Sequence, residues 1–258
     1  MKFFICKKNN IGIENVVKKV QSELEKMGFE YTDSKPDIVI SIGGDGTFLE
    51  AIQNFYSINP LFANINYGNL GYLCEYKSEE LEFFIKDLLD LNRNEKNITL
   101  LECKFNNYEL FAFNEFRIES SRGDTIIFDV FINDTYLETL KGDGCCVSTS
   151  IGSSGMARSI GGAIVDNEIE MIQFVEKAPI HNRSYSSMKS AFVLEKSKVI
   201  TIKNIRNSEF NVFYDNKGVK VGNFHGGINI FLGNKKVRIL KNLRNNYIKK
   251  THEAFIND

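Results

Sequence analysis

A single carboxylate, Asp45, lies among three glycines directly after an apolar run. The stretch "DIVISIGGDGTFLEA" spans residues 37–51, with Gly43 and Gly44 before the aspartate and Gly46 after it. Glycines let backbone N–H groups approach a ligand closely, and the N-terminus of a following helix favours phosphate. Because a carboxylate repels phosphate, Asp45 is suited instead to act on a substrate hydroxyl, or on Mg²⁺ carried by the phosphates.

An Asp-Gly pair is also a common turn, so the surrounding elements decide between the two interpretations. A strand expected before this turn and a helix expected after it favour a functional site, because ligands bind at the carboxyl edge of open α/β sheets. The sequence contains neither the P-loop pattern GxxxxGK[ST] nor the dinucleotide-binding GxGxxG. A different kind of phosphate site is therefore predicted.

The first hundred residues alternate between expected strands and helices. Strands are predicted over residues 2–6, 37–42 and 61–65, and the apolar spacing of residues 13–27 predicts a helix that stops at Gly28. Thr47 and Glu50 have the spacing of a capping box, which places the next helix start just after the glycines. This alternation predicts an α/β domain with a parallel sheet covered by helices.

From residue 97 onward, β-rich segments follow one another and predict a second, β-rich domain with antiparallel strands. Residues 243–255 are expected to form a helix that packs back onto the first domain. We therefore predict one domain from residues 1–97 plus 242–258, carrying the glycine–aspartate site, and a second domain from residues 98–241. The basic stretch over residues 234–250 is interpreted as a solvated face.

Composition narrows the classes of partner and compartment. A formal net charge of -1 over 258 residues gives no electrostatic case for nucleic acid, and no apolar run is long enough for a transmembrane helix. Five scattered cysteines without CxxC spacing argue against zinc and against a disulfide framework. The short apolar start "MKFFICKKNN" does not fit a signal peptide, so the reducing cytoplasm is the expected location.

Four stretches together resemble the NAD kinase family. "GGDGT" (residues 43–47) is a motif that this family shares with diacylglycerol kinases, sphingosine kinases and phosphofructokinases. "NYGNLGYL" (66–73) is similar to the NAD kinase segment N-x-G-x-L-G-F-L, and "FNEF" (113–116) resembles the Asn-Glu motif of that family. "KGDGCCVSTSIGSSGMARSIGGAIV" (141–165) resembles its GDG…STPTGSTAY…GG segment. Their order and their spread over nearly the whole chain favour NAD kinase over the other families.

The resemblance implies transfer of the γ-phosphoryl group of ATP, or of another phosphate donor, to the adenosine 2′-hydroxyl of NAD. Mg²⁺ would accompany the donor, with no tightly held metal site in the protein. Asp45 would accept or orient the proton of the 2′-hydroxyl. The residues implied to bind phosphate, ribose and adenine are Gly44, Gly46, Thr47, Asn114, Glu115, Ser154, Gly155, Met156 and Ser159. Without the resemblance, the Asn-Glu pair is equally typical of a solvated turn, and the Ser/Gly stretch is equally typical of a surface loop.

Further residues are implied to act across a subunit boundary. By the resemblance, Asp143 contacts the nicotinamide ribose and Lys141 lies near the pyrophosphate. In the family, the contacts that match Asp143, Ala178 and Ile180 come from a neighbouring subunit. A homodimer or homotetramer with shared active sites is therefore expected, although the GDG around Asp143 is by itself as typical of a turn.

The chain departs from the family pattern at several positions. Gly155 and Met156 stand where the family has Ala and Tyr, so the phenol that helps to hold the 2′-phosphate is missing. Tyr72 replaces the usual phenylalanine and is expected either to stack on a flat ligand ring or to pack as a core aromatic. Asn69 replaces a frequent histidine, and Ser150 replaces a proline.

Two other functions remain open from the sequence. A lipid kinase would share the GGDGT site, but the pair Asn114–Glu115 and the loop over residues 152–159 argue against it. A non-catalytic dinucleotide-binding regulator is the second alternative. Retention of Asp45 argues against that alternative, because a pure binder has no use for a carboxylate in a phosphate pocket.

Overall fold

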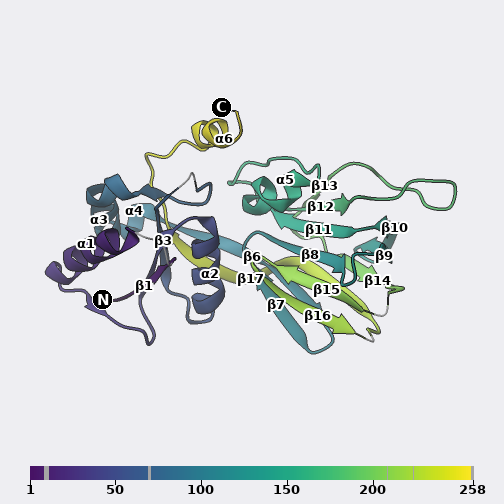
Figure 1. The fold of residues 1–258 in the computed structure, drawn as a ribbon, viewed down its shortest axis with the longest axis horizontal. Coiled ribbons are helices and arrows are strands. Elements are labelled where there is room, and N and C mark those ends of the chain that lie inside the picture. Colours follow the sequence, from purple (N-terminus) through teal and green to yellow (C-terminus); the bar gives the residue numbers. More distant parts are fainter. Residues whose placement is uncertain (9–11, 69–70, 208, 223, 257–258) are drawn as a thin grey trace. The chain divides into compact units, whose positions relative to one another are not determined.

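The computed structural model describes residues 1–8, 12–68, 71–207, 209–222 and 224–256, and it divides the chain into two compact units (Figure 1). Unit 1 comprises Met1–Ile98 and Lys236–Asp258, and unit 2 comprises Thr99–Lys235. The sequence analysis placed the return to the first domain at residue 242, later than Lys236. The unit boundary at Lys236 falls inside the strand Gly227–Leu240, where no break in regular structure marks it.

Unit 1 is an α/β unit with a parallel sheet. The strands are paired in the order β5 or β17, β4, β3, β1 and β2, where β17 and β5 pair with opposite ends of β4. The elements of this unit are β1 (Lys2–Lys7), α1 (Ile13–Lys26), β2 (Glu30–Tyr31), β3 (Ile38–Gly43), α2 (Asp45–Phe55), η1 (Tyr56–Ile58), β4 (Leu61–Asn66), β5 (Tyr76–Lys77), η2 (Ser78–Glu80), α3 (Leu81–Leu89), α4 (Leu91–Asn94) and α6 (Tyr247–Phe255).

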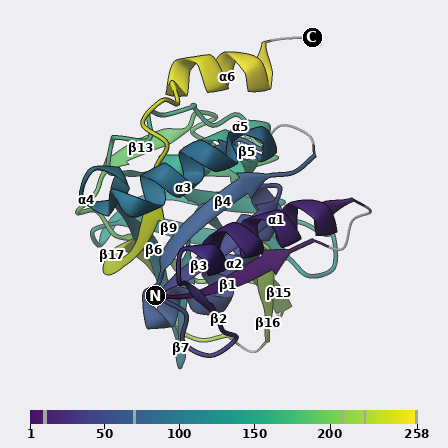
Figure 2. The same ribbon diagram turned by 90° about the vertical axis from the view of Figure 1, so that its left-hand side faces the viewer.

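Helices cover both faces of this sheet, as Figures 1 and 2 show. Alternate residues of β1, β3 and β4 form one core with the apolar faces of α1 and α3, and α2 packs on the opposite face. β3 is buried along its whole length, as expected for a strand covered on both sides. Helix α1 ends in a Schellman motif, in which Gly28, at φ +80°, donates to Glu25 and Phe29 donates to Leu24. The predicted stop at Gly28 and the predicted α/β architecture are therefore confirmed.

Unit 2 is built from antiparallel strands. One sheet has the order β13-β12-β11-β8-β15-β16, and the other contains β10-β9-β14-β17, with β6 and β7 attached through β17. Two of its strands extend into unit 1, since β6 begins there and β17 ends there. The elements are β6 (Glu95–Phe105), β7 (Tyr108–Ala112), β8 (Glu115–Ser120), β9 (Ile126–Ile132), β10 (Thr135–Gly142), β11 (Gly144–Thr149), η3 (Ile151–Ser154), α5 (Met156–Ser159), β12 (Met171–Lys177), β13 (Phe192–Glu195), β14 (Ile200–Lys203), β15 (Glu209–Tyr214), β16 (Lys217–Gly222) and β17 (Gly227–Leu240).

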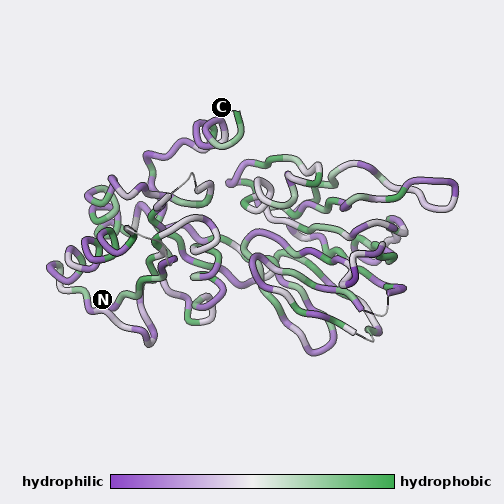
Figure 3. The backbone as a smooth tube through the Cα atoms, in the orientation of Figure 1, coloured by the Kyte–Doolittle hydropathy of each residue, from purple (hydrophilic) through white to green (hydrophobic). Residues whose placement is uncertain are grey.

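The core of unit 2 lies between its two sheets. Inward side chains such as Phe128 and Ile202 from one sheet meet Phe116, Phe174 and others from the second. The hydropathy colouring in Figure 3 shows apolar segments concentrated along the strands and polar segments at many of the turns. Alternating side chains of this kind are what two packed antiparallel sheets require. The prediction of a β-rich second domain is confirmed.

Two local predictions differ from the structure. Helix α2 begins at Asp45 with Gly44 as its N-cap, and no side chain caps it, so the capping box of Thr47 and Glu50 is wrong. The C-terminal helix begins at Tyr247 instead of residue 243, with the Asn246 side chain accepting the Lys249 N–H at 3.0 Å. Within the described residues, no helix is long and apolar enough to cross a membrane.

Candidate active site

The glycine–aspartate motif forms the junction between β3 and α2 in unit 1. Gly43 ends the strand, and a Cβ at this position would lie 2.5 Å from the Oγ1 of Thr47, so only glycine fits there. Gly44 and Gly46 differ, because a Cβ at either would meet nothing within 4 Å. The site is therefore closed behind Gly43 and Thr47, and open on the side of Gly44 and Gly46.

Asp45 is the first residue of α2, and the backbone of a distant segment surrounds its carboxylate. The N–H of Tyr72 donates to Oδ2 at 2.9 Å, and the N–H of Leu73 donates to Oδ1 at 2.9 Å. Gly71 makes this approach possible, since a Cβ there would lie 3.0 Å from Oδ1. Asn69 of the same predicted motif lies outside the described residues.

The electrostatics of Asp45 suit a proton acceptor. Burial raises the pKa of its carboxyl, while the two backbone N–H groups and the positive charge of Lys250 partly offset this effect. A carboxylate with a raised pKa is a stronger base than an exposed one. The site thus combines a helix N-terminus that favours phosphate with a carboxylate able to take or orient a hydroxyl proton.

Tyr72 contributes to this site through its backbone, and its side chain has another partner. The ring lies against Tyr247 and Phe255 of α6, with centroid separations of 5.9 and 5.4 Å. Its hydroxyl lies 3.0 Å from the Oγ1 of Thr251. Of the two expectations for Tyr72, the contacts favour aromatic packing within unit 1.

In unit 2, Asn114 lies between β7 and β8, Glu115 is the first residue of β8, and both have open acceptor atoms. The Oδ1 of Asn114 and the Oε2 of Glu115 are buried and accept no hydrogen bond from any described residue. Burial, followed by the charge of Asp215, raises the pKa of Glu115 to about 8. Buried polar atoms without partners are rare in folded proteins, so this pair is arranged to bind something polar.

The Ser/Gly loop lies directly against this pair. A Cβ at Gly155 would be 3.6 Å from the Oε2 of Glu115 and 3.9 Å from the Nδ2 of Asn114. The hydroxyls of both predicted serines are used locally, since Ser154 donates to the carbonyl of Ile151 and Ser159 to that of Gly155. The structure therefore brings together Asn114, Glu115 and the loop, as the sequence analysis expected of one binding site.

Met156 begins α5 and is half-buried. Its side chain packs against a small apolar cluster of Cys146, Ala157 and Val175. The thioether therefore has a packing role at the position where a phenol was expected from the family pattern.

A second group of predicted residues lies together at the end of β10 and β12. The N–H of Ile180 donates to the carbonyl of Lys141 at 2.7 Å, and the N–H of Asp143 donates to Lys177 at 3.0 Å. The Nζ of Lys141 lies 4.9 Å from the ring centroid of Tyr185. Asp143 and Ala178 are exposed on unit 2, which leaves them accessible to a ligand or a partner.

Both units match one family. Residues 4–93 match the ATP-NAD kinase N-terminal domain, and residues 113–242 match the ATP-NAD kinase C-terminal domain. The chain belongs to the ATP-NAD kinase family. The family resemblance proposed from the four motifs is therefore confirmed, and these motifs lie in the matched parts of the chain.

Relatives of this family member cover its whole length. It is 29% identical to NAD kinase 1 of Oceanobacillus iheyensis, over 100% of this chain and 99% of the relative, and 30% identical to NAD kinase 1 of Bacillus anthracis, over 100% of both. Among solved structures, an Archaeoglobus fulgidus NAD kinase in complex with ATP aligns with a TM-score of 0.81, at 23% identity over 99% of this chain and 97% of that one. Yeast NADH kinase complexed with NADH aligns at 0.87, with 19% identity over 100% and 89%. These two structures share the fold.

Sequence reasoning did not single out Asp215, which holds the backbone segment of Asn114 and Glu115. The carboxylate of Asp215, in the turn between β15 and β16, accepts the N–H groups of Phe113 at 2.9 Å and Asn114 at 2.8 Å. It also accepts the N–H of Glu115 at 3.4 Å. The only local signal is an aspartate in a hairpin turn, which is normally interpreted as a turn former.

The interpretation of the basic stretch as a solvated face is wrong for several of its members. Arg238 forms a two-pronged ion pair with Glu95, at 2.8 and 2.7 Å. Lys241 donates to the buried Glu75 at 2.8 Å, and Arg244 pairs with Asp87. Three successive basic residues of this stretch thus have carboxylate partners in unit 1, and such partners cannot be recognised from local charge patterning.

Proposed function

We propose that this protein catalyses transfer of the γ-phosphoryl group of ATP, or of another phosphate donor, to the adenosine 2′-hydroxyl of NAD. The observation that carries the proposal is the Asp45 carboxylate, held by two backbone N–H groups at the N-terminus of α2. A new bond forms between the 2′-oxygen and the γ-phosphorus, and the bond from that phosphorus to the bridging oxygen of the donor breaks. The products are NADP, the donor diphosphate and one proton.

In this reaction Asp45 would orient the 2′-hydroxyl and accept its proton as the phosphorus–oxygen bond forms. Phosphoryl transfer depends mainly on positioning and on neutralising charge, so one well-placed carboxylate is sufficient at the nucleophile. Asn114 and Glu115 would bind the adenosine end of NAD through their open acceptor atoms. The relatives named NAD kinase 1 support the same reaction.

The donor set around Asp45 fits a magnesium ion held mainly by phosphate. Each carboxylate oxygen already accepts one backbone N–H, and no group of three or more His, Cys, Asp or Glu residues that could hold a metal occurs in the described part of the chain. Mg²⁺ usually retains waters and binds one or two carboxylates together with substrate phosphates. When bound with the donor phosphates, it would neutralise charge on the transferring group, and Asp45 would remain the acceptor of the 2′-hydroxyl proton.

The experiment that tests this function is incubation of the purified protein with ATP, Mg²⁺ and NAD, with chromatographic detection of NADP. Formation of NADP is the expected result. Parallel reactions contain diacylglycerol in place of NAD, with detection of phosphatidic acid. Phosphatidic acid without NADP would replace the proposal with a lipid kinase, and NAD binding by a folded protein without turnover would indicate a regulator.

We also propose that the active form is a homo-oligomer with shared sites, working in the cytoplasm. Exposure of Asp143 and Ala178 on unit 2 supports contribution of this group to a neighbouring subunit. Free thiols at all described cysteines are compatible with a reducing compartment.

The shared site is tested by mixing two inactive variants, Asp45→Asn and Asp143→Ala, and reassembling them. Part of the activity is expected to return, because some sites in a mixed oligomer would contain both native residues. The measurement is NADP formation by the mixture relative to each variant alone. Mixed oligomers that demonstrably form but stay inactive would contradict the shared site.

The Met156→Tyr variant is expected to bind NADP more tightly, because a phenol can donate to a phosphate oxygen and a thioether cannot. A hydrogen bond to a charged group contributes about 1.5–3 kcal/mol, roughly ten- to a hundredfold in affinity. NAD lacks the 2′-phosphate, so its affinity should change only a few-fold. Calorimetric titration of both proteins with NADP and NAD measures the difference. An unchanged NADP affinity in a folded variant would show that Met156 serves packing alone.

A further inference from the structure

A cavity of about 220 Å³ adjoins Asp45 on the side formed by α6. Its walls come from the segment after β4, including Gly71, Cys74 and Glu75, and from the C-terminal segment that includes Lys249 and Lys250. Gly71 lines this cavity and also contacts the carboxylate of Asp45, since a Cβ there would lie 3.0 Å from Oδ1. A ligand in the part of the cavity lined by Gly71 would therefore lie close to the Asp45 carboxylate.

Lys250 brings a positive charge to this cavity. Its Nζ donates to the carbonyl of Cys74, whose Sγ lies 3.7 Å from the Oδ1 of Asp45. Burial lowers the pKa of Lys250, and the charges of Glu75 and Asp45 act in the opposite direction. Among the described residues, no carboxylate forms an ion pair with Lys250. A largely buried ammonium without a direct counter-ion is costly, and an anionic ligand would remove that cost.

Helix α6 is attached to the catalytic segment through Tyr72. The residue whose N–H binds Asp45 uses its side chain to contact three residues of α6, which are Tyr247, Thr251 and Phe255. Asn246 caps the helix by accepting the N–H of Lys249. Tyr72 thus takes part both in the contacts that hold the Asp45 carboxylate and in those that hold the helix of Lys250.

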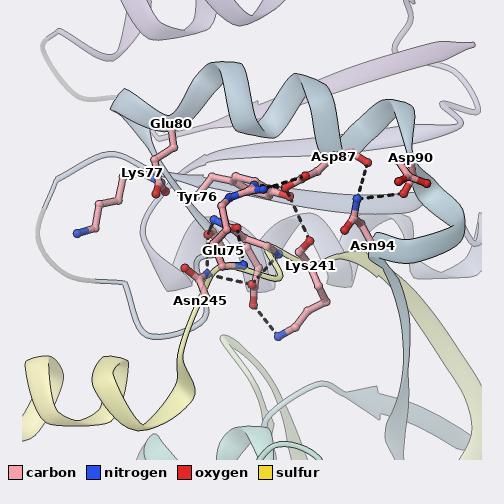
Figure 4. Close-up of polar contacts among 11 residues, drawn as sticks. Glu75, Tyr76, Lys77, Glu80, Asp87, Asp90, Asn94, Lys241 and Asn245 are labelled. Carbon is pink, nitrogen blue, oxygen red and sulfur yellow. Dashed lines mark hydrogen bonds and ion pairs between the residues drawn. The ribbon is translucent and has the colours of Figure 1, made fainter.

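A buried carboxylate secures the segment that leads to α6, as Figure 4 shows. Glu75 accepts from the Nζ of Lys241 at 2.8 Å, from the N–H of Asn242 at 3.2 Å and from the Nδ2 of Asn245 at 3.1 Å. Burial opposes ionisation of Glu75, but Lys241 and Lys250 hold the pKa of its carboxyl below the usual value. Several hydrogen bonds therefore hold residues 241–246, which join β17 to α6 (Figure 2).

We infer that Lys250 of the C-terminal helix is a phosphate-binding residue of the active site, contacting the phosphoryl group that the donor transfers to the 2′-hydroxyl beside Asp45. This inference rests on the proposed phosphoryl transfer. In that step the bond to the donor diphosphate breaks while the bond to the 2′-oxygen forms, and Lys250 keeps its proton throughout. A lysine ammonium is a compact charge with rotatable donors, which suits a group whose oxygens move during transfer.

The experiment compares Lys250→Met with Lys250→Arg and with Lys86→Met. Lys86 is the matched control, because it is an exposed lysine on helix α3 of the same unit and does not line the cavity. The kinetic constants of all variants are measured with ATP and NAD varied separately. Binding of inorganic tripolyphosphate is measured by calorimetry without NAD, so this reading does not depend on turnover.

Lys250→Met is expected to lose about ten- to a hundredfold in kcat/KM for ATP and in tripolyphosphate affinity, with NAD affinity unchanged. Lys250→Arg should recover part of both losses, and Lys86→Met should stay within about threefold of the native protein. Equal behaviour of Lys250→Met and Lys86→Met would overturn the inference, as would an unchanged tripolyphosphate affinity. If the methionine variant does not fold, Lys250→Gln replaces it under the same criteria. A native protein that binds tripolyphosphate through Lys250 but forms no NADP would refute the proposed function alone.

Discussion

The Asp45→Asn variant is expected to form NADP with a kcat lowered by about a hundredfold or more, because general bases contribute roughly 10²–10⁴-fold. The amide retains the size of the carboxylate but cannot accept the 2′-hydroxyl proton. NAD binds mainly through residues of unit 2 in our proposal, so its affinity should change little. Steady-state kinetics with NAD varied at saturating ATP measures both constants.

The structure also predicts a cost that must be separated from catalysis. Each oxygen of Asp45 accepts one N–H, from Tyr72 and from Leu73, whereas an amide supplies one acceptor. One partly buried N–H loses its partner, which costs up to about 1–3 kcal/mol of folding stability. Thermal unfolding of the variant reports this cost independently of kcat.

Glu50→Gln is the matched control, because it makes the same acid-to-amide change at an exposed position of the same helix. It should leave kcat and the unfolding temperature near the native values. Near-normal kcat with a raised KM in Asp45→Asn would mean that Asp45 binds substrate and does not accept the proton. Burial also raises the pKa of Asp45, so the acid limb of native kcat/KM should lie at a higher pH than an exposed aspartate would give.

The architecture was predictable where the sequence pattern that specifies an element lies within the element itself. The apolar run of β3, the helical spacing of α1 and the stop at Gly28 are all patterns within a few residues, and the structure has each of them. The start of α2 was not predictable in detail, because the Thr47 hydroxyl faces the space that Gly43 leaves open and does not cap the helix. A helix N-terminus without a side-chain cap keeps its N–H groups available for a ligand.

The parts of the site that escaped prediction depend on contacts between distant segments. Asp215 binds the backbone of Phe113, 102 residues away, and Lys250 binds that of Cys74, 176 residues away. Each residue has a plain local interpretation, as a turn aspartate or as one member of a basic stretch. Only the fold brings these side chains to the segments that they position, so local charge and turn patterns give the wrong role.

The Asp215→Asn variant is expected to bind NAD about ten- to a hundredfold more weakly, although Asp215 belongs to a turn outside the four motifs. Its Oδ2 accepts the N–H of Phe113, and its Oδ1 accepts those of Asn114 and Glu115. An amide can accept on one side only, so one of these N–H groups would face an NH₂ group. Displacement of binding groups by about 1 Å can cost 10²-fold. Titration of NAD into both proteins gives the measurement.

Asp134→Asn is the matched control for this change. Asp134 also occupies a hairpin turn at positive φ, where asparagine is equally acceptable, and its side chain is 92% exposed. It should leave NAD affinity unchanged. An Asp215→Asn protein with native NAD affinity would show that the three N–H bonds do not position Asn114 and Glu115.

A pH measurement distinguishes the positioning role of Asp215 from a general loss of stability. Burial and the charge of Asp215 raise the pKa of Glu115 from 4.5 to about 8 in the folded protein. The folded state then retains a proton that the unfolded state has released, so this contribution to stability is full below pH 4.5 and is lost as the pH rises through about 8.

Without the charge of Asp215, the pKa of Glu115 falls. The pH range over which this stability is lost therefore ends at a lower pH. Unfolding temperatures across this range should therefore depend on pH less in Asp215→Asn than in the native protein, and least in Glu115→Gln. Parallel pH profiles for the native protein and Asp215→Asn would show that the Asp215 charge does not act on Glu115.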